Sequence, residues 1–132
     1  MASLKGGSTL WSAATLGAAA VSANANIGPG PWVSVYIKNT SGVSLTFKIQ
    51  TSGVSSPYAG RNAMDATVDG GLDWYDYIPA GETSVLSIAV ANGKNVAVDL
   101  SPFSPELIRL VRTDAGGSAA GVSAFVTGFG AN

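Results

Sequence analysis

Apolar and polar residues alternate along several stretches of the chain, which is the pattern of half-buried β-strands. In the stretch WVSVYIK, Val33, Val35 and Ile37 share one face, and a second alternating run, VSLTFKIQ, follows the turn residues NTSG. Two alternating runs around a short glycine-containing loop are typical of a β-hairpin. The pattern therefore predicts a hairpin within residues 33–50.

Further strands are predicted along the rest of the chain. LDWYDY, TSVLSIAV, KNVAVDL, LIRLVRT and VSAFVTGFG each read as a strand, and RNAMDATV fits either a short strand or one helical turn. Asn92 and Gly93 predict a tight hairpin turn between TSVLSIAV and KNVAVDL. The expected fold is all-β: an antiparallel β-sandwich or jelly roll of about seven to nine strands with an extended N-terminal arm.

The N-terminal segment differs from the rest, because it holds one charged side chain, Lys5, among mostly Ala, Gly, Ser and Asn. Lys5 and the small residues ANA at 23–25 fit the two ends of a secretory signal peptide, but the apolar middle is interrupted. We therefore expect residues 1–30 to be an uncleaved assembly arm and residues 31–132 to be a β-sandwich domain. Part of the arm can instead be a first strand at a sheet edge, since TLGAAAVSANANI alternates in part.

Composition limits the partners. The chain has 132 residues, which fits one domain, and only 11% of them are charged, against roughly 25% in ordinary soluble domains. A surface of Ser, Thr, Ala and Gly suits lasting contact with other subunits. The net charge of −1 gives no electrostatic reason to bind nucleic acid or an anionic membrane. No apolar run approaches the length of a membrane span.

The chain is poorly equipped for catalysis. It contains no histidine and no cysteine, which removes the commonest general base, thiol nucleophiles and zinc–thiolate sites. We therefore expect no enzyme and no cofactor. Glu82 and Glu106 could in principle form a glycosidase pair, but nothing in the sequence brings them together.

Four aspartates, Asp65, Asp69, Asp73 and Asp76, lie within a short loop-and-strand stretch. Calcium needs several converging oxygens, but the spacing lacks the alternating ligands and closing glutamate of an EF-hand. We expect solvated turn carboxylates and no metal site, while cation binding by this group stays open.

An aromatic cluster offers a second kind of site. Trp74, Tyr75 and Tyr77, with Tyr58 upstream, could form a platform for sugar rings. Alternation along a strand places Trp74 on the face opposite Tyr75 and Tyr77. Packing in the core or at a subunit interface is therefore favoured over a platform.

The densest cationic spot is Arg109 and Arg112, near Asp114. Two arginines are too few for a nucleic-acid footprint. Ion pairs between strands or between subunits are the favoured interpretation.

Four segments together span nearly the whole chain: TLWSAATLGAAAVSANANIG, WVSVYIKNTSGVSLTFKIQTS, DWYDYIPAG and LIRLVRTDAGGSAAGVSAFVTGFGAN. In their order and style they resemble the small β-sandwich decoration (cement) proteins of tailed-bacteriophage capsids. The resemblance implies a non-enzymatic structural virion protein on the outer capsid surface. Its implied partners are the major capsid protein and further copies of itself, a trimer being favoured over a dimer. It would brace neighbouring capsomers and thereby stabilise the shell.

Within this interpretation, Leu4, Leu10, Trp11 and Leu16 are the expected arm anchors, because large apolar and aromatic residues carry most interface energy. Deleting residues 1–26 is expected to leave a folded sandwich that no longer stays on its partner. Two alternatives remain: a secreted carbohydrate-binding β-sandwich module with Trp74 or Tyr58 in its site, and a tail, fibre or surface-layer subunit.

Overall fold

The computed structural model describes residues 2–26, 32–52, 66–69, 72–79, 81–100 and 107–131. These residues form strands, turns and irregular segments but no helix, so none of them belongs to a helix able to cross a membrane. The all-β prediction is confirmed.

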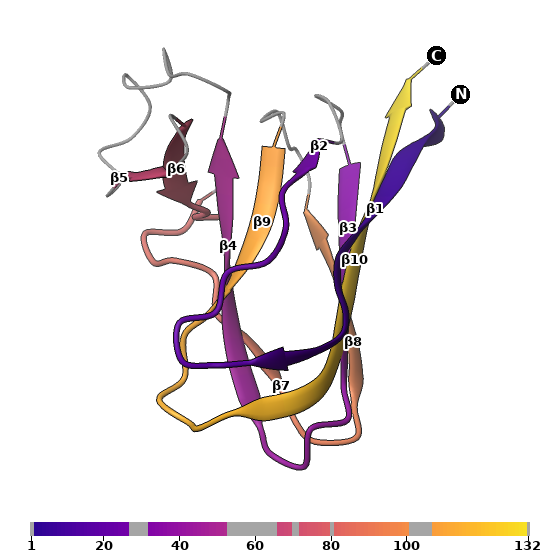
Figure 1. The fold of residues 1–132 in the computed structure, drawn as a ribbon. Coiled ribbons are helices and arrows are strands. Elements are labelled where there is room, and N and C mark those ends of the chain that lie inside the picture. The colour runs from indigo at the N-terminus through magenta and orange to yellow at the C-terminus, as the bar shows by residue number, and fades with distance from the viewer. Residues whose placement is uncertain are drawn as a thin grey trace.

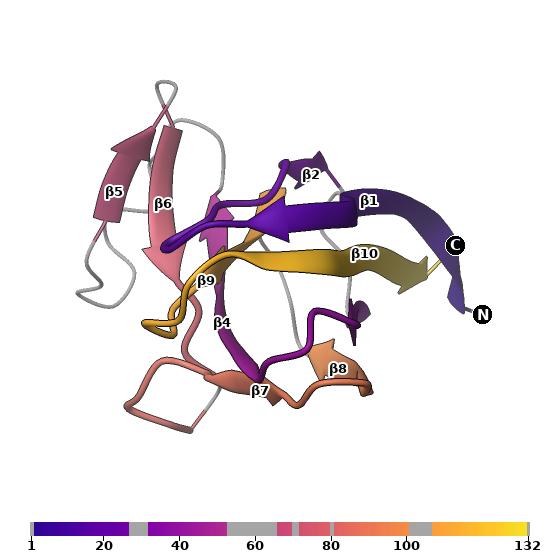
Figure 2. The ribbon, with the colours of Figure 1, turned by 60° about the horizontal axis from the view of Figure 1, so that its bottom comes forward.

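The strands form two antiparallel sheets that face each other as a β-sandwich (Figures 1 and 2). The first sheet has the order β1-β10-β3-β8, and the second has the order β2-β9-β4-β6-β5, with β7 pairing with β4. The strands are β1 (Ala2–Leu16), β2 (Ala25–Asn26), β3 (Trp32–Asn39), β4 (Leu45–Ser52), β5 (Ala66–Asp69), β6 (Leu72–Asp76), β7 (Ile88–Val90), β8 (Asn95–Leu100), β9 (Leu107–Arg112) and β10 (Ala119–Ala131).

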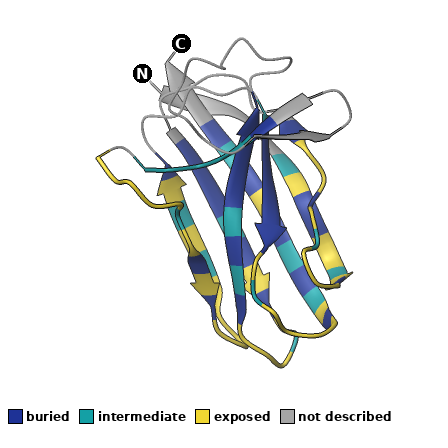
Figure 3. Ribbon diagram, turned by 90° about the vertical axis from the view of Figure 1, so that its left-hand side faces the viewer, coloured by how far each residue is buried: buried dark blue, intermediate teal, exposed yellow. Residues whose placement is uncertain are grey.

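The core lies between the inner faces of the two sheets. Buried and exposed positions alternate along several strands, which is visible as colour bands in Figure 3. These strands turn one side chain in two toward the core, as the sequence pattern predicts, whereas β9 and the second half of β4 are buried at consecutive positions. The largest apolar side chains with almost no exposure include Phe47, Leu16, Ile37, Leu45, Ile49, Ile108, Leu110, Val33, Val35 and Val90.

The hairpin predicted within residues 33–50 is wrong, because β3 and β4 belong to different sheets. The loop between them carries the chain across the core, so the apolar faces of both strands meet instead of lying side by side. The Asn39 side chain, fully buried, holds this corner: its Nδ2 donates to the carbonyl oxygens of Val43 at 2.7 Å and Val90 at 2.9 Å. An alternating pattern specifies which face is buried but not which strand is the neighbour.

The turn predicted at Asn92 and Gly93 does form, with Gly93 at a φ of 78°. The hairpin predicted around it is wrong, since β7 and β8 again lie in different sheets. The chain thus passes from one sheet to the other both between β3 and β4 and between β7 and β8. These two connections are linked, because the Gly42 N–H donates a hydrogen bond to Asn92 Oδ1 at 2.8 Å. The strand alternative for RNAMDATV holds at residues 66–69, which form β5 and pair with β6.

The N-terminal segment is part of the sandwich. β1 pairs with β10 from Ala2 opposite Ala131 to Leu16 opposite Ala119, at an edge of the first sheet. Beyond β1 the chain crosses to the second sheet, where the Ser22 N–H donates to the Leu110 carbonyl oxygen at 2.9 Å. The sequence pattern allowed a first strand at a sheet edge as an alternative to a free arm, and this strand is present.

This placement corrects the expected arm anchors. Leu10 and Leu16 are 3% and 2% exposed, and the Trp11 ring lies 5.5 Å from the Phe47 ring. These three side chains pack into the chain's own core and are therefore not the free anchors of an extended arm. Leu4 lies in β1, but its side chain is outside the described set.

Candidate functional site

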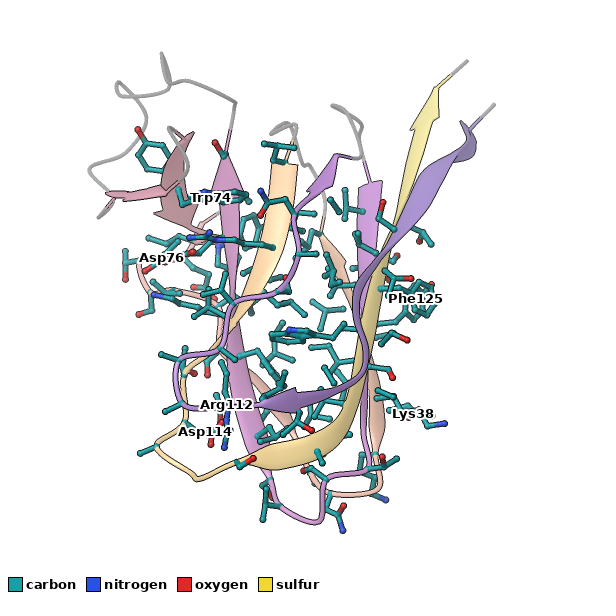
Figure 4. The ribbon with its side chains drawn as sticks, in the orientation of Figure 1. Lys38, Trp74, Asp76, Arg112, Asp114 and Phe125 are labelled. Atoms are coloured by element: carbon teal, nitrogen blue, oxygen red, sulfur yellow. The ribbon has the colours of Figure 1, made fainter. Side chains whose placement is uncertain are left out.

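The outer face of the first sheet carries an exposed aromatic pair. Phe125 on β10 is 46% exposed and points away from the sandwich (Figure 4). Tyr36 lies directly opposite on β3, and the two rings stack with centroids 4.6 Å apart and planes 13° apart. Their neighbours in the same cross-strand row are Thr9 on β1 and Ala97 on β8. Because Thr9 and Ala97 are short, the rings stand above them as a ridge, called here the Tyr36–Phe125 ridge.

A shallow hollow of about 320 Å³ lies on each side of this ridge. The first, toward β8, is lined by Tyr36, Ile37, Lys38, Asn95, Val96, Ala97, Ser123 and Phe125. The second, toward β1, is lined by Ser8, Thr9, Trp11, Ser12, Ser123, Ala124 and Phe125. Since each stacked ring covers one face of the other, the free face of Tyr36 borders the first hollow and that of Phe125 borders the second.

Few charges surround the ridge. Among the described side chains on this outer face, Lys38 and Asp99 carry the charges, and Asp99 Oδ1 accepts a hydrogen bond from Ser34 Oγ at 2.6 Å. The side chain of Ser123, which lines both hollows, is also held in place, because its Oγ accepts a hydrogen bond from the Ala13 N–H at 2.9 Å. This side of the sheet therefore offers two aromatic ring faces, surrounded mainly by neutral hydrogen-bonding groups.

The sequence contains a signal for the exposure of this pair. Tyr36 and Phe125 each occupy the polar phase of an alternating strand, next to Ser34, Lys38 and Ser123. A large aromatic residue in that phase is expected to be exposed. The stacking itself needs the β3–β10 register, which the sequence does not specify.

The predicted aromatic cluster around Trp74 has a packing role. Trp74 is 0% exposed, and the Arg109 guanidinium carbon lies 4.1 Å from its ring centroid, a cation–π distance. Tyr75 and Tyr77 are half-buried, and burial raises the pKa of the Tyr77 hydroxyl. The favoured prediction of core packing is confirmed for Trp74, while Tyr58 lies outside the described residues.

Asp76 belongs to a polar network on the second sheet. Lys48 Nζ lies 3.0 Å from Asp76 Oδ1, which also accepts from Gln50 Nε2 at 3.0 Å. Gln50 Oε1 in turn accepts from Arg109 Nε at 2.8 Å. Both the charge and the lone pairs of Asp76 are therefore engaged by protein groups.

The other predicted carboxylates are only partly described. Asp69 and Asp73 lie in β5 and β6, but their side chains, like all of Asp65 and Glu106, are outside the described set. Glu82 is exposed. Within the described parts of the chain, no three acidic, histidine or cysteine side chains gather as a metal site would require.

Arg112 forms an ion pair with Asp114, which lies two residues further along the same chain. The pair is therefore local and does not join two strands or two subunits, whereas the sequence pattern favoured an ion pair of that kind. Arg112 Nη2 lies 2.9 Å from Asp114 Oδ2, and the Arg112 side chain is fully buried. Arg112 Nη1 also donates to the Leu16 carbonyl oxygen at 2.9 Å. The hydrogen bonds from Arg112, supported by the Thr46 and Gly116 N–H groups, hold the pKa of the Asp114 carboxyl well below its usual range.

Comparisons with known proteins identify no family. No family model matches the chain, and no curated protein matches its sequence. Several solved structures, among them the following three, are similar to the chain. The first is from work on Bacillus endospore appendages, a family of disulfide-linked pili, at a TM-score of 0.43 and 17% identity, covering 98% of this chain and 86% of that one.

The second similar structure is CorA, a surface-associated copper-binding protein of Methylomicrobium album BG8, at a TM-score of 0.42 and 9% identity, covering 96% of this chain and 92% of that one. The third contains the CBM22-1 and GH10 modules of xylanase 10B from Clostridium thermocellum, at a TM-score of 0.39 and 13% identity. That match covers 97% of this chain and 26% of the other.

Proposed function

We propose that the protein is a structural assembly subunit of the capsid-decoration kind, which docks on the outer surface of a virion shell through the Tyr36–Phe125 ridge. The exposure of Phe125, 46% in a stacked pair on an ordered sheet, is the observation that carries this proposal. A stacked pair is already held in place, so docking it costs little side-chain entropy.

The surroundings of the ridge favour a protein surface as the partner. Aromatic anchors that fill a complementary site dominate interface energies, and the two hollows can receive side chains on both sides of the ridge. Because Lys38 and Asp99 are the charges on the described part of this face, its binding is expected to depend little on salt. Repetition over a shell multiplies modest contacts through avidity.

The N-terminal segment has a different part in this proposal from that of a free arm. β1 supplies Ser8, Thr9 and Ser12 to the wall of the second hollow. It thus contributes to docking as a fixed edge of the face, with its large apolar side chains in the core.

Co-sedimentation with expanded capsids or empty shells from the native source tests this function. The full chain is expected to bind in a fixed ratio, and Phe125→Ser is expected to bind at least tenfold more weakly (about 1.4 kcal/mol or more). Val43→Ser is the matched control, since Val43 is equally exposed at 47% but lies in the loop between β3 and β4. A full chain that ignores shells, or equal losses in both variants, would refute the proposal.

A second candidate is a carbohydrate-binding module, favoured by one observation. In the first hollow the free face of Tyr36 lies beside the polar side chains of Lys38 and Asn95. Apolar sugar faces pack on aromatic rings while their hydroxyl groups bond to such neighbours. Binding of the full chain to an immobilised glycan, lost in Tyr36→Ala and without affinity for shells, would favour this candidate.

A further inference from the structure

β8 leaves one edge of the first sheet open. It pairs with β3 over six consecutive residues without a register shift, and no described strand pairs with its other edge. The opposite edge strand, β1, has four register shifts and contains Ala13 at a φ of 43°. A regular edge without proline or bulge is a template for another strand, whereas a bulged edge is protected.

The backbone groups that face the open edge of β8 can be assigned. The Asn39 N–H donates to the Lys94 carbonyl oxygen at 3.1 Å, so that carbonyl points toward β3. Direction alternates with a period of two along an antiparallel strand. The N–H and C=O groups of the even-numbered residues of β8 therefore point to β3, and those of Asn95, Ala97 and Asp99 point to the open edge.

We propose that this edge binds β8 of a second copy of the chain, antiparallel and centred on Ala97. In this register Ala97 faces Ala97 of the second copy, and Asn95 faces Asp99 at both ends. Every outward-pointing backbone group of these residues then meets a complementary one, and each of the three pairs exchanges two hydrogen bonds. The two four-stranded sheets become one continuous sheet.

The side chains select the same register. Asn95 is an amide donor and Asp99 is a carboxylate whose Oδ1 is already held by Ser34 Oγ, which leaves Oδ2 for the Asn95 amide of the second copy. A two-fold axis at Asp99 would instead set two carboxylates against each other, which is destabilising. On the inner face Val96 meets Val98, and both are only half-buried in the single chain.

Disulfide trapping tests the register directly, because the chain has no cysteine of its own. Directly opposed, hydrogen-bonded residues have Cα atoms about 5.5 Å apart, within the range that a disulfide spans. Under mild oxidation at micromolar concentration, Ala97→Cys is expected to give mainly covalent dimer. Ala89→Cys is the matched control, since Ala89 is an exposed alanine of β7 in the other sheet, and it is expected to stay mainly monomeric.

A charge swap tests the side-chain contacts without oxidation. Sedimentation equilibrium of the full chain is expected to show a dimer, and Asn95→Asp is expected to raise the dissociation constant at least tenfold by opposing two carboxylates. The double variant Asn95→Asp with Asp99→Asn exchanges donor and acceptor and is expected to restore dimerisation. Asn95 is exposed, so its substitution leaves the fold unchanged.

These experiments need no shell, so their outcome is independent of the docking function proposed for the Tyr36–Phe125 ridge. A monomer at every concentration would overturn the proposal, as would equal cross-linking of Ala97→Cys and Ala89→Cys. A dimer or trimer that Asn95→Asp leaves unchanged would overturn it as well. One outcome of a separate experiment with shells would also contradict a second copy. If the backbone amides of Asn95–Asp99 are protected from hydrogen exchange only when the chain is bound to shells, the open edge of β8 binds another partner.

Discussion

The Arg112 guanidinium donates both to the Asp114 carboxylate and to the Leu16 carbonyl oxygen, so one buried cation joins the end of β9 to the end of β1. The contact spans 96 positions of the sequence. The first strand is therefore held at this end by the side chain of Arg112, through a hydrogen bond to a backbone carbonyl that the sequence pattern did not predict.

Replacing Asp114 by Ala is expected to lower the free energy of unfolding by about 3 kcal/mol, because it leaves the buried Arg112 charge uncompensated. Asp76→Ala is the matched control. The two carboxylates are about equally exposed, at 19% for Asp76 and 18% for Asp114. Their cationic partners differ, because the Lys48 side chain is 27% exposed and the Arg112 side chain is fully buried. Loss of the Lys48 pair is expected to cost about 1 kcal/mol. Urea denaturation measures both, and equal losses would contradict the role of Arg112 burial.

Acid is expected to weaken the same contact. The folded pKa of Asp114 is depressed below its unfolded value, so its contribution to stability is complete above about pH 4 and is lost as the pH falls toward the folded pKa. The stability advantage of the wild type over Asp114→Asn should therefore shrink between about pH 4 and pH 2. Urea midpoints across that range test this, and a constant difference would argue against it.

Truncation of Trp11 is expected to unfold the domain instead of releasing it from a partner. Trp11→Ala removes a ring packed on Phe47 and should cost about 3–5 kcal/mol. Thr9→Ala, on the same strand but exposed, should change stability by less than about 0.5 kcal/mol. Thermal melting followed by circular dichroism compares them.

Deletion of residues 1–26 removes β1, β2 and four of the described core side chains, those of Leu10, Trp11, Leu16 and Ala25, so the product is expected to lack a cooperative melting transition. A truncated chain that melts cooperatively near the full-length temperature would restore the arm interpretation.

Gly121 is expected to tolerate alanine less well than Gly42. Both have a positive φ, 82° and 94°, at which a side chain costs about 1–2 kcal/mol. A Cβ at Gly121 would also lie 2.6 Å from Thr40 Oγ1, whereas a Cβ at Gly42 would have no atom within 4 Å apart from its own residue and the two residues next to it in the chain. The free energy of unfolding should fall further for Gly121→Ala than for Gly42→Ala. Adding Thr40→Ala to Gly121→Ala should recover part of the difference, because it removes the clash but also the 2.7 Å hydrogen bond from Thr40 Oγ1 to the Gly121 carbonyl oxygen.

Alternation predicted the strands well, because it depends only on which face of each strand is dry. The buried positions Val33, Val35 and Ile37 appear as expected. Alternation did not predict which strands pair with each other, because two alternating runs fit a hairpin within one sheet and a connection between two sheets equally well. The connection between β3 and β4 is held by the hydrogen bonds from Asn39 to Val43 and Val90. Because Val90 is far from Asn39 in the sequence, the pattern could not reveal this contact.

The candidate site was less predictable than the fold. Trp74 drew attention by its size and is buried, while Phe125 in the sequence VSAFVTG looked like an ordinary strand residue. Its exposure and its stacking on Tyr36 depend on the pairing of β10 with β3. The burial of Leu10, Trp11 and Leu16 could not be predicted, because the Ala, Gly and Ser residues around them are typical of a segment without a fold of its own.

The pairing of β1 with β10 also determines how the molecule responds to force. Ala2 lies opposite Ala131, and Figure 1 shows both chain ends emerging at the same corner. Tension applied between the two ends would load the cross-strand hydrogen bonds one pair after another, as in a zipper, because these bonds run perpendicular to the strands. A pull on one end against the far tip of the sandwich would instead load the whole β1–β10 ladder in shear, so the mechanical strength of the domain depends on the two points between which the force is applied.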